Sequence, residues 1–113
     1  MVPADTVYIR HILDAILRIG IYLDGIDEDE FMRNHLVQDG VIRQLEIIGE
    51  AAKQISQKTR RDHDHIPWKD IAGMRDKLIH AYFGVDVGQV WLTAKNDIPV
   101  LQKDIAEILG LLK

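Results

Sequence analysis

The sequence contains no cysteine, only three prolines, and no apolar run of 18 residues. Without cysteine the chain can form neither a disulfide nor a thiolate metal site. The missing apolar run excludes a membrane-spanning helix, and the start of the sequence has no signal-peptide pattern, so we expect a cytoplasmic protein with no membrane partner. No segment alternates apolar and polar residues with a period of two, and we therefore expect no β-sheet.

Apolar residues recur instead at helical spacing along most of the chain. The pattern predicts four main helices, over residues 4–24, 35–56, 68–83 and 87–112. No internal repeat or Pro/Gly-rich linker interrupts the 113 residues, which indicates one domain spanning residues 1–113 with one core. Four main helices with short connections predict an all-α fold, an antiparallel four-helix bundle.

Local signals refine this bundle. Asp27 can cap a short extra helix, and Glu30 has the spacing that completes a capping box. The polar residues 56–65 are expected to form a loop. Pro99 removes one backbone hydrogen bond from the last helix, which predicts a kink near Pro99, with a break into two helices as the alternative. Gly49 and its alanine neighbours permit another helix to approach closely.

The stretch from Met74 to Gly84 contains Arg75, His80 and Tyr82, spaced Arg-x4-His-x-Tyr. On an ideal helix Arg75 shares an apolar stripe with Ile71, Leu78 and Tyr82, whereas His80 points about 140° away, near Asp76. An imidazole can move protons and a guanidinium can stabilise charge that develops on phosphate oxygens. The pair therefore suits phosphodiester chemistry, and Asp76 could hydrogen-bond His80 and select its tautomer.

Each of these residues also has a structural interpretation. Arg75 on an apolar stripe could form an ion pair with a carboxylate of another helix, and Glu46 and Glu50 are candidates. His80 could be a solvated surface histidine. Two clusters resemble metal sites, but the acidic run Asp27–Glu30 fits a helix start better, and His63-Asp64-His65 fits a solvated turn better. We therefore expect no metal and no cofactor.

The runs Ile42–Ser56 and Ile66–Asp86, with the intact Arg-x4-His-x-Tyr motif, closely resemble the HepT-like family within the HEPN superfamily. Members are the toxins of type VII HepT–MntA toxin–antitoxin pairs. The resemblance covers essentially the whole chain and implies a HEPN-like bundle that acts as a homodimeric, metal-independent endoribonuclease. It also implies that Arg75 and His80 are catalytic and that Asp76 occupies the polar position after the arginine.

The same resemblance implies a partner and a modification. A minimal nucleotidyltransferase antitoxin of the MntA type would silence the toxin by AMPylating Tyr82. The resemblance leaves the RNA target open, although tRNA is the substrate of characterised members.

The net charge of −4 is unusual for an RNA-binding protein, but the charges are unevenly distributed. Residues 1–52 carry a net charge of −6, and residues 78–113 carry −1. Residues 53–77 carry +3 and lead into the motif. Besides Arg75, the basic residues of that stretch are candidate contacts to RNA phosphates: Lys53, Lys58, Arg60, Arg61, Lys69 and Lys77.

These observations lead to a hypothesis of mechanism. Two protomers place their motifs in one cleft, since Arg75 and His80 diverge on a single ideal helix. His80 acts on the ribose 2′-hydroxyl or on the leaving oxygen, and Arg75 stabilises the phosphate charge. The alternatives are a non-catalytic docking or substrate-binding subunit of a nucleotidyltransferase, and a purely structural bundle.

Overall fold

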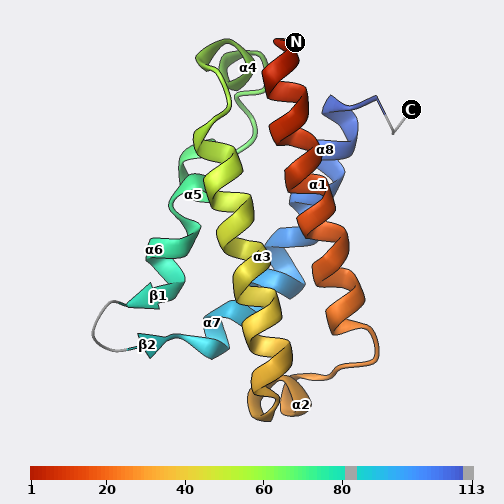
Figure 1. Ribbon diagram of the computed structural model, residues 1–113, viewed down its shortest axis with the longest axis vertical. Helices are drawn as coiled ribbons and strands as arrows, with labels where there is room; N and C mark the ends of the chain where they lie inside the picture. Colours follow the sequence, from red (N-terminus) through yellow and green to blue (C-terminus); the bar gives the residue numbers. More distant parts are fainter. Residues whose placement is uncertain (81–83, 111–113) are drawn as a thin grey trace.

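The computed structural model describes residues 1–80 and 84–110, with the backbone alone described for Ile79 and His80. Two long helices, α1 (Pro3–Leu23) and α3 (His35–Lys53), pack side by side in antiparallel directions (Figure 1). The short α2 (Glu28–Arg33) lies between them in sequence. Asp27 caps α2 as predicted, because its carboxylate accepts a 2.8 Å hydrogen bond from the backbone N–H of Glu30.

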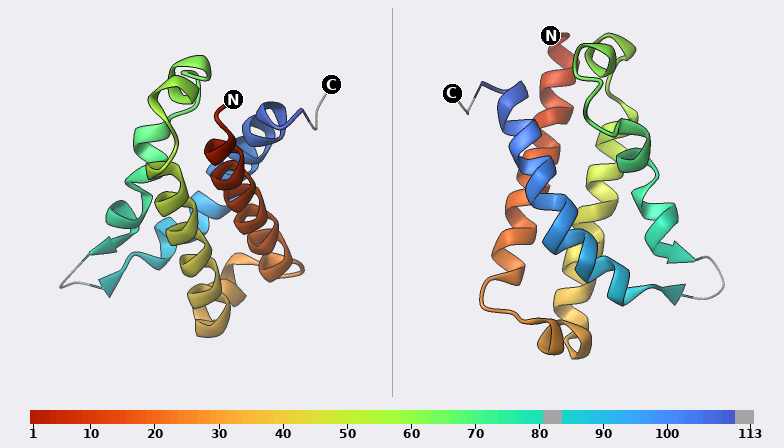
Figure 2. Two further views of the ribbon diagram at one scale, coloured as in Figure 1. Left: turned by 45° about the horizontal axis from the view of Figure 1, so that its top comes forward. Right: turned by 180° about the vertical axis from the view of Figure 1, so that it is seen from behind.

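The second half of the chain consists of shorter elements. They are α4 (Gln57–Asp62), α5 (Trp68–Ala72), α6 (Met74–Leu78), β1 (Ile79–His80), β2 (Gly84–Val85), α7 (Val87–Leu92), the π-helical turn η1 (Thr93–Asp97) and α8 (Ile98–Ile108). α5 and α6 run along α3, and α7, η1 and α8 return diagonally behind α1 and α3 (Figures 1 and 2). This arrangement confirms the predicted all-α, HEPN-like bundle.

The core fills the space between these helices with aliphatic side chains. Ile9 and Ile12 of α1 and Ile48 of α3 are fully buried. Phe31 of α2 packs on Trp91 of α7, with ring centroids 5.2 Å apart. Of the described helices, none is long and apolar enough to cross a membrane.

The backbone of α5 lies against α3 at Gly49. A Cβ built on this residue would be 3.4 Å from the carbonyl oxygens of Ile71 and Ala72, which is just at van der Waals contact. α3 is therefore the helix against which the first part of the motif region is positioned.

The prediction of a loop over residues 56–65 is wrong in part, because this segment contains α4. Ser56 caps this helix by accepting from the backbone N–H of Thr59. The signal was a Ser N-cap in a polar stretch without an apolar stripe, so helical periodicity could not reveal it. The carboxylate of Asp5, only 2% exposed, accepts hydrogen bonds from the side chains of Ser56 and Thr59 and from the Ser56 N–H.

The predicted single helix over residues 68–83 is also wrong. Gly73 interrupts it between α5 and α6, and α6 ends at Leu78. Ile79 pairs with Val85 and His80 with Gly84 in a two-stranded antiparallel ladder, which also corrects the expectation of no sheet. Gly84 adopts φ of 80°, a conformation that glycine reaches without strain, and the backbone of Asp86 returns to Leu78 through a 3.0 Å hydrogen bond.

The last predicted helix, over residues 87–112, is confirmed as one continuous helical path from Val87 to Ile108. Its irregularity is a π-helical turn, Thr93–Asp97, which ends two residues before Pro99. Proline has no N–H to complete the regular hydrogen-bond ladder, and a π-turn is one way in which a helix accommodates such a gap. The predicted end at 112 falls among residues 111–113, outside the described part of the chain.

Candidate active site

Arg75 lies on α6 at the surface of the bundle. Its side chain is 49% exposed, between the buried residues Met74 and Leu78. The expectation that Arg75 occupies the buried stripe is therefore wrong, because the short α6 turns only Met74 and Leu78 inward. An exposed guanidinium needs no internal partner for its charge, and it remains accessible to a ligand.

Glu46 of α3 holds the guanidinium from one side. The Nε–H group of Arg75 donates a 3.2 Å hydrogen bond to Oε2 of Glu46, which confirms one of the two carboxylates proposed as partners. Asp76 is nearby, with Oδ1 3.8 Å from NH1 of Arg75, too far for a hydrogen bond. Among the described residues, no hydrogen bond uses the NH1 and NH2 groups, so both remain available to a phosphate.

The structure describes Asp76 in full, but only the backbone of His80 and nothing of Tyr82. Arg75 and His80 do not share a helix, since the backbone of His80 belongs to β1. Asp76 is 82% exposed and reaches toward Arg75, while the side chain of His80 and the whole of Tyr82 lie outside the described residues. The proposed hydrogen bond from Asp76 to His80 therefore stays a prediction.

The six basic residues predicted to contact RNA differ in what already binds them. Lys53 pairs with Glu50, and Lys58 pairs with Asp62 at 2.8 Å, a hydrogen bond that lowers the pKa of the Asp62 carboxyl. Arg60 donates to the carbonyl oxygen of Ala52 in the last turn of α3 and to that of Ile55, two residues beyond its end. Arg60 thus has a structural role as a C-terminal cap of α3.

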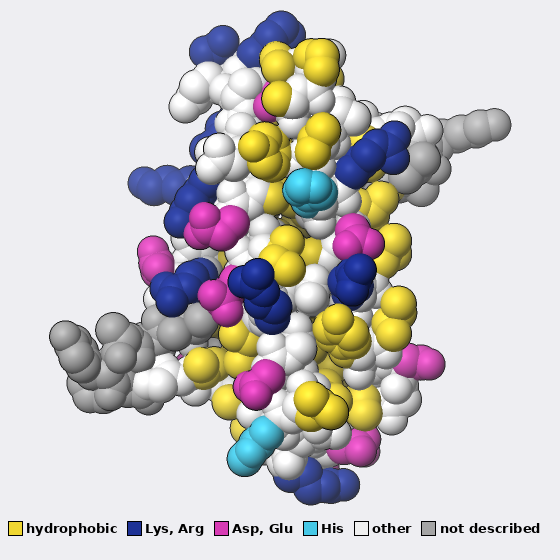
Figure 3. Space-filling model, in the orientation of Figure 1, with side chains coloured by type: hydrophobic (Ala, Val, Ile, Leu, Met, Phe, Trp, Pro, Cys, Tyr) yellow, Lys and Arg dark blue, Asp and Glu magenta, His cyan; other side chains and the backbone are white. Residues whose placement is uncertain are grey.

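The remaining three, Arg61, Lys69 and Lys77, are exposed. Figure 3 shows Lys and Arg side chains along the edge of the molecule formed by α4, α5 and α6, interspersed with acidic ones. The edge that carries Arg75 is therefore mixed in charge, with a basic excess that comes from residues 53–77.

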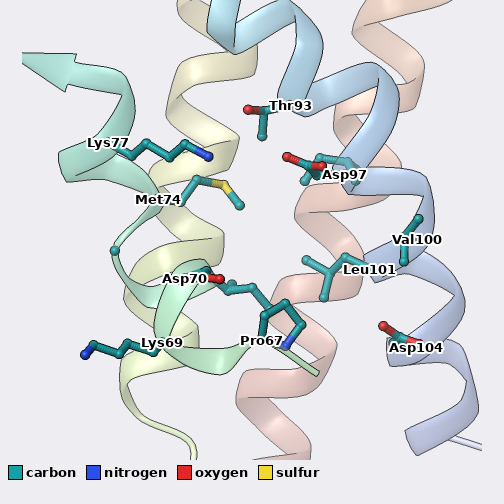
Figure 4. Close-up of a pocket in the computed structure, with 13 residues that line it drawn as sticks. Pro67, Lys69, Asp70, Met74, Lys77, Thr93, Asp97, Val100, Leu101 and Asp104 are labelled. Carbon is teal, nitrogen blue, oxygen red and sulfur yellow. The ribbon is translucent and has the colours of Figure 1, made fainter. Parts of the chain in front are cut away.

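A cavity of about 690 Å³ lies beside the motif, between α5 and α6 on one side and η1 and α8 on the other. Its apolar lining includes Ile71, Met74 and Leu101. Lys77 extends across it toward Asp97, whereas Lys69 points away from it (Figure 4). Three carboxylates also line the cavity, those of Asp70, Asp97 and Asp104, so its charge does not favour a phosphate group.

Sequence reasoning missed two groups of polar residues. Asp5 stands near the start of α1, and nothing in its surroundings in sequence indicates that it binds Ser56 and Thr59. His65, Asp104 and Glu107 form a cluster whose donor atoms all lie within 4.8 Å of one another. The histidine was noticed as part of His63-Asp64-His65, but the carboxylates come from a distant helix.

Comparisons with known proteins agree on one family. The family model described as "Ribonuclease HepT-like" matches residues 12–108. The "Probable ribonuclease HepT" of Thermococcus cleftensis is 50% identical over 95 residues, which cover 84% of this chain and 86% of that protein. The "Putative RNase" of Caldanaerobacter subterraneus is 43% identical over 102 residues, covering 90% of this chain and 91% of the relative.

A longer relative also matches. The "Gamma-glutamylcyclotransferase and putative RNase" of Methanocaldococcus jannaschii is 47% identical over 103 residues, 91% of this chain. The chain spans about half the length of that relative, since the match covers 46% of it. No solved structure is a significant match.

Proposed function

The chain belongs to the HepT-like ribonuclease family, and from this premise we propose that it is a metal-independent endoribonuclease whose reaction depends on Arg75 and His80. The observation that carries the proposal is the state of Arg75. The guanidinium is half exposed, Glu46 binds its Nε–H, and NH1 and NH2 donate no hydrogen bond within the described part of the chain, where Oδ1 of Asp76 stays 3.8 Å from NH1. A guanidinium held in this way presents two parallel donors to a phosphate.

The proposed reaction is an internal transfer at phosphorus. The ribose 2′-oxygen forms a bond to phosphorus, the bond from phosphorus to the 5′-oxygen breaks, and a 2′,3′-cyclic phosphate remains. His80 takes the proton from the 2′-hydroxyl or gives one to the leaving 5′-oxygen. Arg75 donates hydrogen bonds to the phosphate oxygens, where negative charge increases in the transition state.

Glu46 acts as the positioning residue of this site. A carboxylate on the long, well-packed α3 fixes the direction of the Arg75 side chain, which stands on a helix of only five residues. Asp76, the neighbour of Arg75, is proposed to orient His80. Arg61, Lys69 and Lys77 are exposed, form no ion pair with another described residue, and are the proposed phosphate contacts.

We also propose that the active form is a homodimer. The earlier geometric reason, that Arg75 and His80 diverge on one helix, no longer applies because they occupy different elements. The proposal now depends on the family resemblance and on exposed apolar side chains near the motif. Leu92, 49% exposed, ends α7, which packs against α6, and Val100, 62% exposed, lines the neighbouring cavity.

The regulatory partner proposed is an MntA-type nucleotidyltransferase that AMPylates Tyr82 and so makes this chain the toxin of a toxin–antitoxin pair. Tyr82 follows His80 by two residues, so an attached AMP would add bulk and negative charge beside the reacting groups. Substrate phosphates would then be repelled. tRNA is the proposed substrate class.

The test is cleavage of RNA by untagged protein purified without a partner, in the presence of EDTA, after its intact mass has been measured. We expect cleavage that persists in EDTA, yields 2′,3′-cyclic phosphate ends and disappears in His80→Ala. His11→Ala, which removes an exposed histidine of α1, is the matched control and should cleave normally.

Other outcomes have distinct meanings. Full activity in His80→Ala would contradict the proposed mechanism. No cleavage by protein of unmodified mass would favour a docking subunit for a nucleotidyltransferase. No cleavage together with a mass increase equal to AMP would support silencing at Tyr82, which Tyr82→Phe should then prevent.

A further inference from the structure

A second site lies at the other end of the cavity from Lys77. His65 precedes α5, and Asp104 and Glu107 stand three residues apart on α8, so the two carboxylates project from one face of that helix. Nε2 of His65 is 3.9 Å from Oδ1 of Asp104, and the donor atoms of all three residues lie within 4.8 Å of one another. Figure 4 shows Asp104 at the same end of the cavity as Pro67, two residues after His65.

Among the described residues, no Lys or Arg forms an ion pair with this cluster. The side chain of Asp104 is only 19% exposed, and its single ion-pair partner among the described residues is His65, at a distance too long for a hydrogen bond. Glu107 places a second carboxylate beside it, and two adjacent carboxylates repel each other. A partly buried acidic group is stabilised by a paired positive charge, and Asp104 has room for one beside it.

We propose that His65, Asp104 and Glu107 bind a divalent transition-metal ion of the Zn²⁺ class. One imidazole nitrogen and two carboxylate oxygens are ligands that zinc accepts, whereas magnesium and calcium prefer oxygen ligands alone. Water fills the remaining position or positions. This site is separate from Arg75 and His80 and takes no part in the proposed cleavage.

Zinc binding requires side-chain movements of different sizes. Zinc binds nitrogen and oxygen at about 2.0–2.2 Å, so two ligands of a tetrahedral ion are about 3.4 Å apart. The 3.9 Å between His65 and Asp104 needs to shorten by about half an ångström, and the other pairs, which lie within 4.8 Å, by up to about 1.4 Å. The His65 side chain is 56% exposed, so it can make this adjustment by rotation without disturbing the core.

The bound ion would join two parts of the fold. His65 lies in the connection between α4 and α5, and α8 belongs to the returning helical path. An ion held by both ties the start of α5 to α8. Because the unfolded chain has no such site, binding stabilises the folded state by mass action.

The experiment uses untagged full-length protein that has been treated with EDTA and dialysed. Titration with ZnCl₂ by calorimetry should show one ion per chain. The melting temperature should rise by roughly 10 °C when free zinc is a hundred times its dissociation constant. MgCl₂ at the same concentration should produce no comparable shift. His65→Ala and Asp104→Asn should each weaken zinc binding at least tenfold.

His63→Ala is the matched control, since this neighbouring histidine is outside the cluster, with its ring centroid 6.3 Å from that of His65. It should bind zinc like the unaltered chain. Circular dichroism shows whether each variant is folded, and Glu107→Gln, at an exposed position, offers a third test. Absence of zinc binding, binding unaffected by His65→Ala and Asp104→Asn, or equal loss in His63→Ala would each overturn the proposal. RNA cleavage does not enter this experiment, so the proposed ribonuclease activity can fail or succeed independently.

Discussion

Two regions of the molecule differ in how far their side chains are buried. One is the helix pair α1 and α3, and the other is the motif segment, residues 74–80. The pair consists of two long, regular helices whose inward side chains, such as Ile12 and Ile48, are fully buried. The motif segment has five helical residues and two strand residues, and its charged members Arg75, Asp76 and Lys77 are exposed. One region is organised by burial, and the other is organised around groups that stay accessible.

This difference indicates that the helix pair provides stability, whereas the motif segment provides the groups for activity. The long helices provide the surface on which the motif segment is positioned. Two contacts with α3 do this: the Arg75–Glu46 hydrogen bond, and the contact of the α5 backbone with Gly49 just before the motif segment. Substitutions in the two regions should therefore separate activity from stability. The predictions below test that separation.

The largest separation is expected for Arg75→Ala. Removing the guanidinium takes away the donors that stabilise phosphate charge, and loss of one such interaction commonly lowers the rate of an enzyme by about 10²–10³-fold. The free energy of unfolding should change by less than about 1 kcal/mol, because the side chain is half exposed and its ion pair is at the surface. Single-turnover RNA cleavage and urea unfolding measure the two quantities.

Arg10→Ala serves as the control, since Arg10 is an exposed arginine of α1. It should alter neither quantity. Normal cleavage by Arg75→Ala, or a melting temperature lowered as strongly as by a core substitution, would show that Arg75 is a structural residue.

The converse is expected for Ile48→Ala. Ile48 of α3 is fully buried, and truncation of such a side chain to alanine costs about 2–5 kcal/mol through lost transfer free energy and the cavity that remains. Cleavage per folded molecule should be little changed at a temperature where the variant is folded. Ile21→Ala is the control, because Ile21 is 71% exposed and its loss should cost little.

The same contrast explains what the sequence could predict. The i, i+3, i+4 pattern reports burial, so it located α1, α3 and the path from α7 to α8, whose inward residues are mostly aliphatic. It failed at α4, where the N-cap Ser56 and not an apolar stripe defines the helix. The pattern also failed after Leu78, where it predicts that the helix continues but the backbone forms β1. Pairing of β1 with Gly84 and Val85 competes there with the local helical preference.

Some features of the candidate site could likewise be predicted from the sequence and others could not. The residue types of Arg75, His80 and Glu46 could be read from the chain, and Glu46 is one of the two carboxylates that the sequence offers as partners of Arg75. The exposure of Arg75 was not, because the ideal helical wheel assumes a continuous helix through Gly73. Contacts between distant residues, such as Asp5 with Ser56 or His65 with Asp104, depend on the completed fold and leave no local signal.

Asp5→Asn tests the largest polar interaction that ties α1 to α4. Burial raises the pKa of Asp5, but the hydrogen bonds from Ser56 and Thr59 outweigh it, so the pKa is lower than its ordinary value of 3.8. A carboxyl with a depressed pKa stabilises the fold above its unfolded pKa, and this contribution is lost as the pH falls through the folded pKa. We expect Asp5→Asn to cost about 1–3 kcal/mol at pH 7.

The pH dependence sharpens this prediction. The unaltered chain should lose stability as the pH falls below about 4, and Asp5→Asn should show a smaller decrease over the same range. Urea unfolding at a series of pH values measures both. Asp14→Asn, at an exposed carboxylate paired with Arg18, is the control, and an identical effect of the two substitutions would contradict the role given to Asp5.

The smallest effect, and the most direct test of how the two regions are joined, is expected for Glu46→Gln. Glutamine can still accept the hydrogen bond from Nε–H of Arg75 but removes the negative charge, so stability should change by less than about 1 kcal/mol. Cleavage should fall about three- to tenfold in kcat and further in Glu46→Ala, which leaves the guanidinium without its anchor; a misplaced charged group lowers the rate even when the fold is intact. Glu50→Gln provides the control one helical turn away, where the carboxylate pairs with Lys53 instead. If Glu46→Ala and Glu50→Gln cleave RNA equally well, α3 supports α6 by packing alone and the ion pair contributes nothing to the site.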